Sequence, residues 1–134
     1  MKDIQMIGYV TLGTNDLERS AAFYDALLGR MGARRAYGTD RLVAWRFGEG
    51  GSPLLVLNMP FDHAAATAGN GSMVALRVDD AEAVDRLHAL ALELGASDEG
   101  APGQRGGGFY GAYFRDPDGN KLNLHCYRTE SPSP

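Results

Sequence analysis

The chain has 134 residues, which is the length of one typical domain. Its 13 Lys and Arg residues against 17 Asp and Glu residues give a net charge of -4, and the basic residues form no run, so we expect no nucleic-acid partner. No apolar run is longer than four residues, as in Leu54 to Leu57, which is far below the roughly 20 residues of a membrane-spanning helix, and residues 1–5 have no signal-peptide core. The single cysteine, Cys126, excludes an intrachain disulfide. We expect a cytoplasmic protein without a membrane partner.

An internal repeat organises the sequence. When the chain is shifted by about 64 positions, the segment Tyr9 to Glu18 lies over Met73 to Glu82. Each copy predicts a short strand, a capping pair (Asn15-Asp16 or Asp79-Asp80) and a helix with an apolar stripe. The stripes comprise Leu17, Ala21, Tyr24 and Leu28 in the first copy and Val84, Leu87, Ala91 and Leu94 in the second. His88 lies one position from the second stripe, and we expect it on the surface.

The ends of the two halves match at a shift of about 67. Ala44 to Phe47 then lies over Gly111 to Phe114, and Leu54 to Asn58 lies over Lys121 to His125. Each pair of segments is typical of two strands around a turn. Together with the first strand, the helix and one extra strand in each half, they predict the order β-α-β-β-β for each module.

The repeat predicts one α+β domain, residues 1–134, that arose by duplication. Its two modules span about 3–60 and 70–130. Residues 59–70 connect them as a crossover loop or a short helical turn.

Side chains of alternating strand positions fall into two sets. Two helices cover only one face of so many short strands, so we expect the other face to line a cavity. The set predicted to face the helices comprises Val10, Leu12, Val43, Trp45, Phe47, Leu55, Leu57, Val74, Leu76, Val78, Tyr110, Ala112, Phe114, Leu122, Leu124 and Cys126. The set predicted to face the cavity comprises Tyr9, Thr11, Arg46, Val56, Asn58, Met73, Ala75, Arg77, Phe109, Tyr113, Asn123 and His125.

Two segments resemble a known family. Tyr113 to His125 contains Asp116-Pro-Asp-Gly119 between two strands, and Asn15 to Tyr24 enters the first helix. With the duplicated modules, these segments resemble the vicinal oxygen chelate superfamily, which includes glyoxalase I, bleomycin and fosfomycin resistance proteins and extradiol dioxygenases. The resemblance implies a curved mixed sheet around a cavity, helices on the outer face, and a homodimer.

The resemblance also implies where a metal would bind. In metal-dependent members, four strand positions supply His, Gln or Glu ligands, and the matching positions here are Tyr9, Val56, Met73 and Asn123. Valine has no donor atom, methionine is a soft ligand, and a phenol and an amide are neutral. We therefore expect no metal and no cofactor at this site, which disfavours the glyoxalase I reaction.

His125 and Tyr113 are the candidate catalytic residues, for acid-base work on a substrate. Arg46 and Arg77 are candidates to hold an anionic group. The alternative for His125 is a histidine that only forms hydrogen bonds, and the alternative for each arginine is an ion pair with an acidic residue. His63, in the connecting segment, is either at the cavity mouth or a solvated loop residue.

The remaining candidate binding residues line the same predicted face: Tyr9, Val56, Met73, Phe109 and Asn123. They favour a small ligand of anionic or aromatic character. Gly106 to Gly111 has the spacing of a dinucleotide motif but leads into a strand, so we expect a mobile lip there, where glycines allow positive φ and the close approach of a ligand. The sequence leaves three functions open: a metal-free small-molecule binding protein, a lyase or isomerase similar to lactoylglutathione lyase, and a protein that sequesters an antibiotic or toxin.

Overall fold

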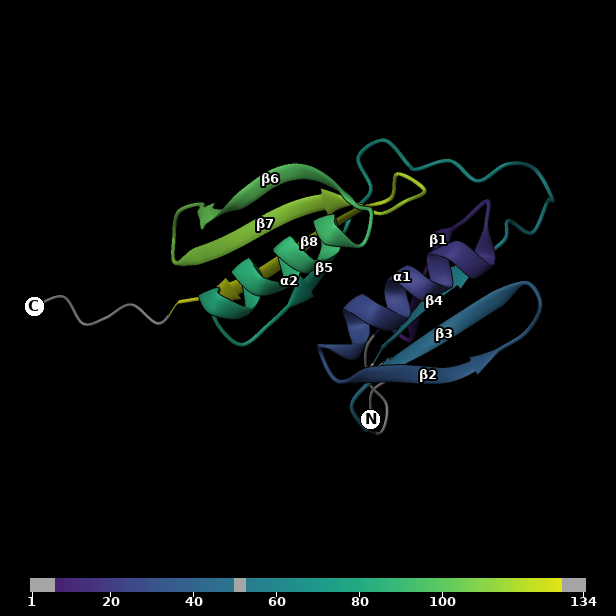
Figure 1. Ribbon diagram of the computed structural model, residues 1–134, viewed down its shortest axis with the longest axis horizontal. Coiled ribbons are helices and arrows are strands. Elements are labelled where there is room, and N and C mark those ends of the chain that lie inside the picture. The colour runs from purple at the N-terminus through teal and green to yellow at the C-terminus, as the bar shows by residue number, and fades with distance from the viewer. Residues whose placement is uncertain (1–6, 50–52, 129–134) are drawn as a thin grey trace, which may run out of the picture. The chain divides into compact units, whose positions relative to one another are not determined.

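The chain forms two compact units, Met1–Thr67 and Ala68–Pro134. The structure is a computed structural model and describes residues 7–49 and 53–128. Within these described residues, each unit contains one four-stranded sheet and one helix (Figure 1). The turn predicted between the segments Ala44 to Phe47 and Leu54 to Asn58 includes residues 50–52, which lie outside the described residues.

The first unit has the predicted order of elements, which are β1 (Tyr9–Gly13), α1 (Leu17–Gly29), β2 (Ala33–Gly38), β3 (Leu42–Phe47) and β4 (Leu54–Asn58). Its strands are arranged β1-β4-β3-β2. The pair β1 and β4 is parallel and the other pairs are antiparallel, so the sheet is mixed.

The second unit repeats this arrangement with β5 (Val74–Arg77), α2 (Ala81–Glu93), β6 (Ser97–Gln104), β7 (Phe109–Arg115) and β8 (Lys121–Tyr127). The strand order is β5-β8-β7-β6, again with only the first pair parallel. The α+β class and the duplicated β-α-β-β-β modules are confirmed.

The strand registers test the two sequence shifts. Val10 pairs with Leu55, and Val74 pairs with Leu122, which agrees with shifts of about 64 and 67. Trp45, however, also pairs with Leu55, while the residue opposite Leu122 on β7 is Phe114.

The equivalent of Trp45 is therefore Phe114, and the alignment of Ala44–Phe47 with Gly111–Phe114 is wrong by two residues. A slip of two positions leaves every side chain on its own face of the sheet, because the side-chain period of a strand is two. Hydrophobic alternation was therefore unable to detect the error.

Each helix begins at the aspartate of its capping pair. The Asp16 carboxylate accepts a hydrogen bond from the Arg19 amide at 3.1 Å, and the Asp80 carboxylate accepts one from the Ala83 amide at 2.9 Å. Past the helix ends, Gly32 and Gly95 have φ angles of +87° and +114°, which glycine adopts without strain.

The helices bury most of the predicted stripes against their own sheets. Helix α1 contacts β2, β3 and β4, and α2 contacts β6, β7 and β8. Neither 13-residue helix is long and apolar enough to cross a membrane, a finding that covers the described part of the chain.

The prediction that His88 is a surface residue is wrong. The residue is only 4% exposed, and its Nε2 atom lies 3.2 Å from both the Asp98 carboxylate and the Tyr113 carbonyl oxygen. The apolar stripe identified the centre of the buried face, whereas the face of a packed helix is wide enough to include a neighbouring polar residue that has partners.

The connecting segment 59–70 contains turns and no helical residue, so it is a crossover loop. Asn15 holds it to the first unit, because its side chain donates to the Ala66 carbonyl and accepts from the Ala66 amide.

The Asp116–Asn120 turn is equally well defined, since the Asp116 carboxylate accepts from the amides of Asp118 and Asn120.

Candidate functional site

The second unit gathers most of the candidate residues on one face of its sheet. On β8, Asn123 and His125 point to the face opposite α2. The paired positions Ala75 and Arg77 on β5, and Tyr113 and Gly111 on β7, share that face.

Aromatic rings surround the His125 side chain, which is 9% exposed. The Phe109 ring is stacked on the imidazole with centroids 5.0 Å apart, and the Tyr127 ring meets the imidazole edge-on at 5.6 Å. Phe109 and Tyr127 also contact each other at 5.5 Å. These three rings form a cluster at one end of the face.

A hydrogen-bond chain fixes the proton position on neutral His125. The Asn123 amide nitrogen donates to the Ala112 carbonyl at 3.2 Å, which leaves the Asn123 Oδ1 atom to face the imidazole. Because that oxygen only accepts, the Nδ1 atom of His125, 2.6 Å away, carries the proton. The lone pair of the neutral ring is then on Nε2. Among the described residues, every buried side-chain polar atom has a hydrogen-bond partner.

The environment favours this neutral ring. Burial lowers the pKa of His125 below its ordinary value, and the positive charge of Arg77 lowers it further. At neutral pH the Nε2 atom is therefore available to accept a proton or a hydrogen bond.

Cations lie over the tyrosine rings of the same unit. The Arg77 guanidinium lies 4.9 Å from the Tyr127 ring centroid. Arg105 and Lys121 lie 5.5 and 5.4 Å from the Tyr113 ring centroid. Among residues 7–49 and 53–128, no carboxylate forms an ion pair with any of these three cations. The face is therefore both aromatic and electropositive.

Gly111 makes the close packing possible. A Cβ atom at this position would lie 2.9 Å from the Phe109 ring, 3.1 Å from the Asn123 amide nitrogen and 3.3 Å from the Leu124 carbonyl oxygen. Since these two side chains hold His125, the absence of a side chain at Gly111 shapes the site.

Tyr9, Val56 and Arg46 belong to the first unit, whereas the His125 cluster belongs to the second. Tyr9 is 62% exposed, Arg46 is exposed, and Val56 is only 3% exposed on central strand β4. Met73, just before β5 in the second unit, is 44% exposed. Tyr113 shares the face of His125, and its ring contacts Arg105 and Lys121.

The four positions at which the family holds a metal do not fit a divalent ion. Val56 has no donor, the Asn123 amide is engaged with Ala112 and His125, and Tyr9 and Met73 supply a neutral phenol and a thioether. Within the described part of the chain, no three His, Cys, Asp or Glu residues are grouped so that they could hold a metal.

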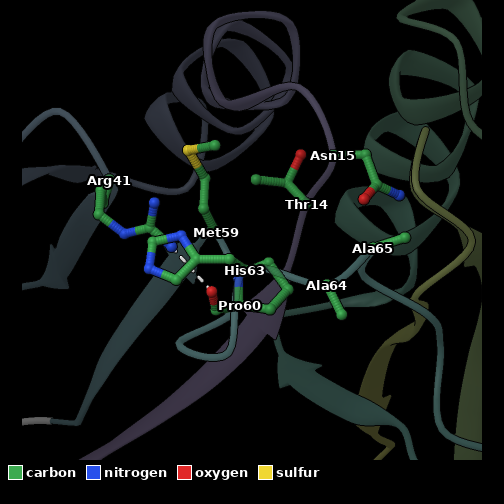
Figure 2. Close-up of a pocket in the computed structure, with 8 residues that line it drawn as sticks. All are labelled: Thr14, Asn15, Arg41, Met59, Pro60, His63, Ala64 and Ala65. Carbon is green, nitrogen blue, oxygen red and sulfur yellow. Dashed lines mark hydrogen bonds between the residues drawn. The ribbon is translucent and has the colours of Figure 1, made fainter.

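A pocket of about 190 Å³ lies in the first unit (Figure 2). It is bordered by Thr14 and Asn15 after β1, by Arg41 before β3, and by the start of the connecting segment, including His63. His63 is an exposed loop residue, as one of its two sequence interpretations predicted.

The sequence interpretation missed several residues of the His125 face: Gly111, Arg105, Lys121 and Tyr127. Tyr127 follows His125 by two positions, so strand alternation alone could have found it. Lys121, two positions before Asn123 on β8, could have been found in the same way, whereas Arg105 follows the end of β6, where alternation predicts nothing.

Comparison with known proteins agrees with this fold. Residues 6–124 match the model of the Glyoxalase/Bleomycin resistance protein/Dioxygenase superfamily. A glyoxalase/bleomycin resistance protein from Albidiferax ferrireducens is 35% identical, with a TM-score of 0.81, over 91% of this chain and 98% of that one. None of the curated proteins matches this chain.

Two further solved structures are more distant. A hypothetical protein from S. aureus is 29% identical, with a TM-score of 0.72, over 93% of this chain and 95% of that one. A lactoylglutathione lyase from Agrobacterium tumefaciens is 22% identical, with a TM-score of 0.70, over 93% of this chain and 96% of that one, and shows a shared fold. The chain belongs to the glyoxalase/bleomycin resistance protein/dioxygenase superfamily.

Proposed function

We propose that the protein binds a small organic anion with a planar, aromatic body on the His125 face, without a metal at the family's site. The observation that carries this proposal is the Phe109–His125 stack beside an arginine that has no ion pair among the described residues. An aromatic ligand extends the ring cluster, and its anionic group supplies Arg77 with a partner.

The test uses benzoate with two matched probes. Cyclohexanecarboxylate keeps the carboxylate without the aromatic ring, and benzyl alcohol keeps the ring without the charge. Titrations followed by amide NMR should give saturable shifts around Gly111 and His125 for benzoate, and weaker binding for each of the other probes.

Two variants separate the contributions of charge and ring. Arg77→Gln and Phe109→Leu should each weaken benzoate binding, the first by about tenfold if one charge-assisted contact is lost. Arg86→Gln, which removes an exposed arginine of α2, is the matched control and should bind as the wild type does. Equal binding by all variants, or shifts that do not saturate, would exclude this site.

The second candidate is a lyase or isomerase that uses His125 as its base. The specific support is the hydrogen-bond chain through Asn123, which leaves the neutral ring with a lone pair on Nε2. Asn123 then orients the base, and Tyr113 on the same face is the candidate proton donor.

A simple proton-transfer assay tests this candidate. In deuterium oxide, the wild type should accelerate exchange of the α-hydrogens of 2-hydroxyacetophenone above the buffer rate. His125→Gln should lose the acceleration while its amide spectrum remains that of a folded protein, and it should also weaken benzoate binding because the ring stacked on Phe109 is lost. Acceleration that survives in His125→Gln would remove His125 as the base, and no acceleration by the wild type would leave binding as the only activity supported.

The proposal includes a cytoplasmic homodimer, in line with the family resemblance. Sedimentation equilibrium at micromolar concentration should give the mass of two chains. The mass of one chain under those conditions would contradict it.

A further inference from the structure

The pocket in the first unit, here called the Arg41 pocket, is lined chiefly by Thr14, Asn15, Arg41, Met59, Pro60 and His63. It lies where the parallel strands β1 and β4 end and the connecting segment begins. All of its lining residues belong to the first unit, so it is complete without the second unit.

One carbonyl group in this pocket holds both the Arg41 side chain and the His63 backbone. The Arg41 Nη2 atom donates to the Pro60 carbonyl oxygen at 2.7 Å, as the dashed line in Figure 2 shows. The backbone amide of His63 donates to the same oxygen at 3.0 Å. These bonds fix the guanidinium and the histidine backbone relative to each other.

No described carboxylate neutralises the charge of Arg41. No carboxylate is among the residues that line the pocket, and no described Asp or Glu forms an ion pair with Arg41. The Asp62 carboxylate beside His63 accepts from the Ala64 amide. A guanidinium with donors to spare, next to an imidazole, suits an oxyanion.

The backbone of His63 is held in an unfavourable conformation. Its φ angle of +66° is the single positive φ of a non-glycine residue in the described part of the chain. Such strain persists where the surroundings determine the conformation, and it is found at ligand sites. In this case the surroundings are the Pro60 turn to which Arg41 is also bonded.

The duplication provides an internal comparison. Asn15 corresponds to Asp79 at the shift of about 64, and the second unit has a pocket of about 440 Å³ at that place. That pocket is lined by Asp79, Asp80, Glu82 and Arg128, with Ala81 and Cys126. The fold therefore creates a pocket in both units, whereas a basic lining without carboxylates is particular to the first.

We propose that the Arg41 pocket binds a small oxyanion, either a phosphate or a carboxylate group, through the Arg41 guanidinium and the His63 ring. This site is independent of the proposed function at His125, since it lies in the other unit and shares none of its residues.

The experiment is an amide NMR titration of the full chain with inorganic phosphate and, separately, with succinate. Sodium chloride at matched ionic strength is the salt control. The expected result is saturable shifts at Asn15, His63 and Ala64 that chloride does not reproduce. Tighter binding of phosphate than succinate, or the reverse, identifies which oxyanion the pocket takes.

Variants locate the binding. Arg41→Gln should weaken binding of the titrated oxyanion by about tenfold or more. The affinity of Arg41→Lys should lie between those of Arg41→Gln and the wild type. Arg30→Gln, which changes an exposed arginine of the same unit, should have no effect. His63→Gly should keep or raise the melting temperature, because glycine relieves the positive φ, and should still weaken binding.

Three results would overturn the proposal: no saturable shift with either anion, equal weakening in Arg30→Gln and Arg41→Gln, or saturable shifts confined to the face of Arg77. The last result would leave an anion site at His125 intact, so failure here and failure of the proposed function are distinguishable.

Discussion

The imidazole of His125 lies nearly parallel to the Phe109 ring, with an interplanar angle of 18° and centroids 5.0 Å apart. This stack covers one face of the imidazole, and burial is the main cause of the lowered pKa of His125. Phe109→Ala should therefore raise the pKa of His125 toward its ordinary value, because water regains access to the ring. NMR titration of the imidazole proton checks this, and an unchanged or lower pKa would contradict it.

The lowered pKa also predicts how stability depends on pH. A histidine whose pKa is lower in the folded state stabilises the fold while it is neutral, and this contribution is lost as pH falls. The loss should begin below the ordinary pKa of 6.5 and be complete once pH passes below the folded-state pKa. Urea unfolding from pH 7.5 downward should show a fall in the free energy of unfolding that is smaller in His125→Gln.

Gly111→Ala should damage the His125 site without touching His125. The added Cβ atom would lie 2.9 Å from the Phe109 ring and 3.1 Å from the Asn123 amide, so both side chains must move. Overpacking of this kind costs about 1–3 kcal/mol. We expect lower stability and weaker benzoate binding, measured by thermal unfolding and NMR titration. Ala75→Ser, on the same face at an exposed position of β5, is the control.

The sequence was sufficient to predict the fold because the signal is repeated. Both helix starts, at Asp16 and Asp80, and the order of elements in each module follow from copies of one pattern. The two-residue error at Trp45 and Phe114 was invisible because it changes no face.

The site was only partly predictable, for a different reason. Alternation placed His125, Asn123 and Arg77 on one face of one strand pair. It gave no information on the partner of each side chain, such as the Asn123 oxygen that sets the His125 proton, because partners depend on rotamers and neighbouring strands. His88 was misplaced for the same reason, since its partners Asp98 and Tyr113 lie on β6 and β7.

Asp25 joins α1 to its sheet through two partners. Its carboxylate accepts from the Trp45 indole at 2.9 Å and from the Arg35 guanidinium at 3.0 and 2.8 Å. Trp45 is fully buried, so Asp25→Ala leaves its N–H group without this partner, at a cost of about 1–3 kcal/mol. Arg35→Gln should cost less than about 1 kcal/mol, because the ion pair is about half-exposed.

Trp45, the single tryptophan of the chain, reports this unfolding directly by fluorescence. The Arg35 guanidinium is the main reason that the pKa of Asp25 is lowered, so the stabilisation by Asp25 should be lost as pH falls below its ordinary value of 3.8. If Arg35→Gln lost as much free energy of unfolding as Asp25→Ala, the hydrogen bond from the Trp45 indole would not be the larger contribution of Asp25, and the prediction would be wrong.

His88 links α2 to β6 and β7, and its removal should be costly. His88→Ala loses the contacts to Asp98 and to the Tyr113 carbonyl and leaves space in a packed interface, so we expect a loss of about 1–3 kcal/mol. Denaturant unfolding followed by circular dichroism measures the loss. Arg86→Ala, an exposed substitution on the same helix, should stay within about 0.5 kcal/mol of the wild type.

Added divalent metal should change neither binding nor activity through the family's four positions. Val56 offers no ligand, and the Asn123 amide is already bonded on both its atoms, so Zn²⁺ or Ni²⁺ has no adequate donor set there. Elemental analysis after a soak and removal of free ion should find well below one equivalent, and assays with either ion should detect no lactoylglutathione formation. Near-stoichiometric metal that is retained in His125→Gln would contradict the donor argument, whereas metal that is lost in His125→Gln would indicate a metal site relocated to His125.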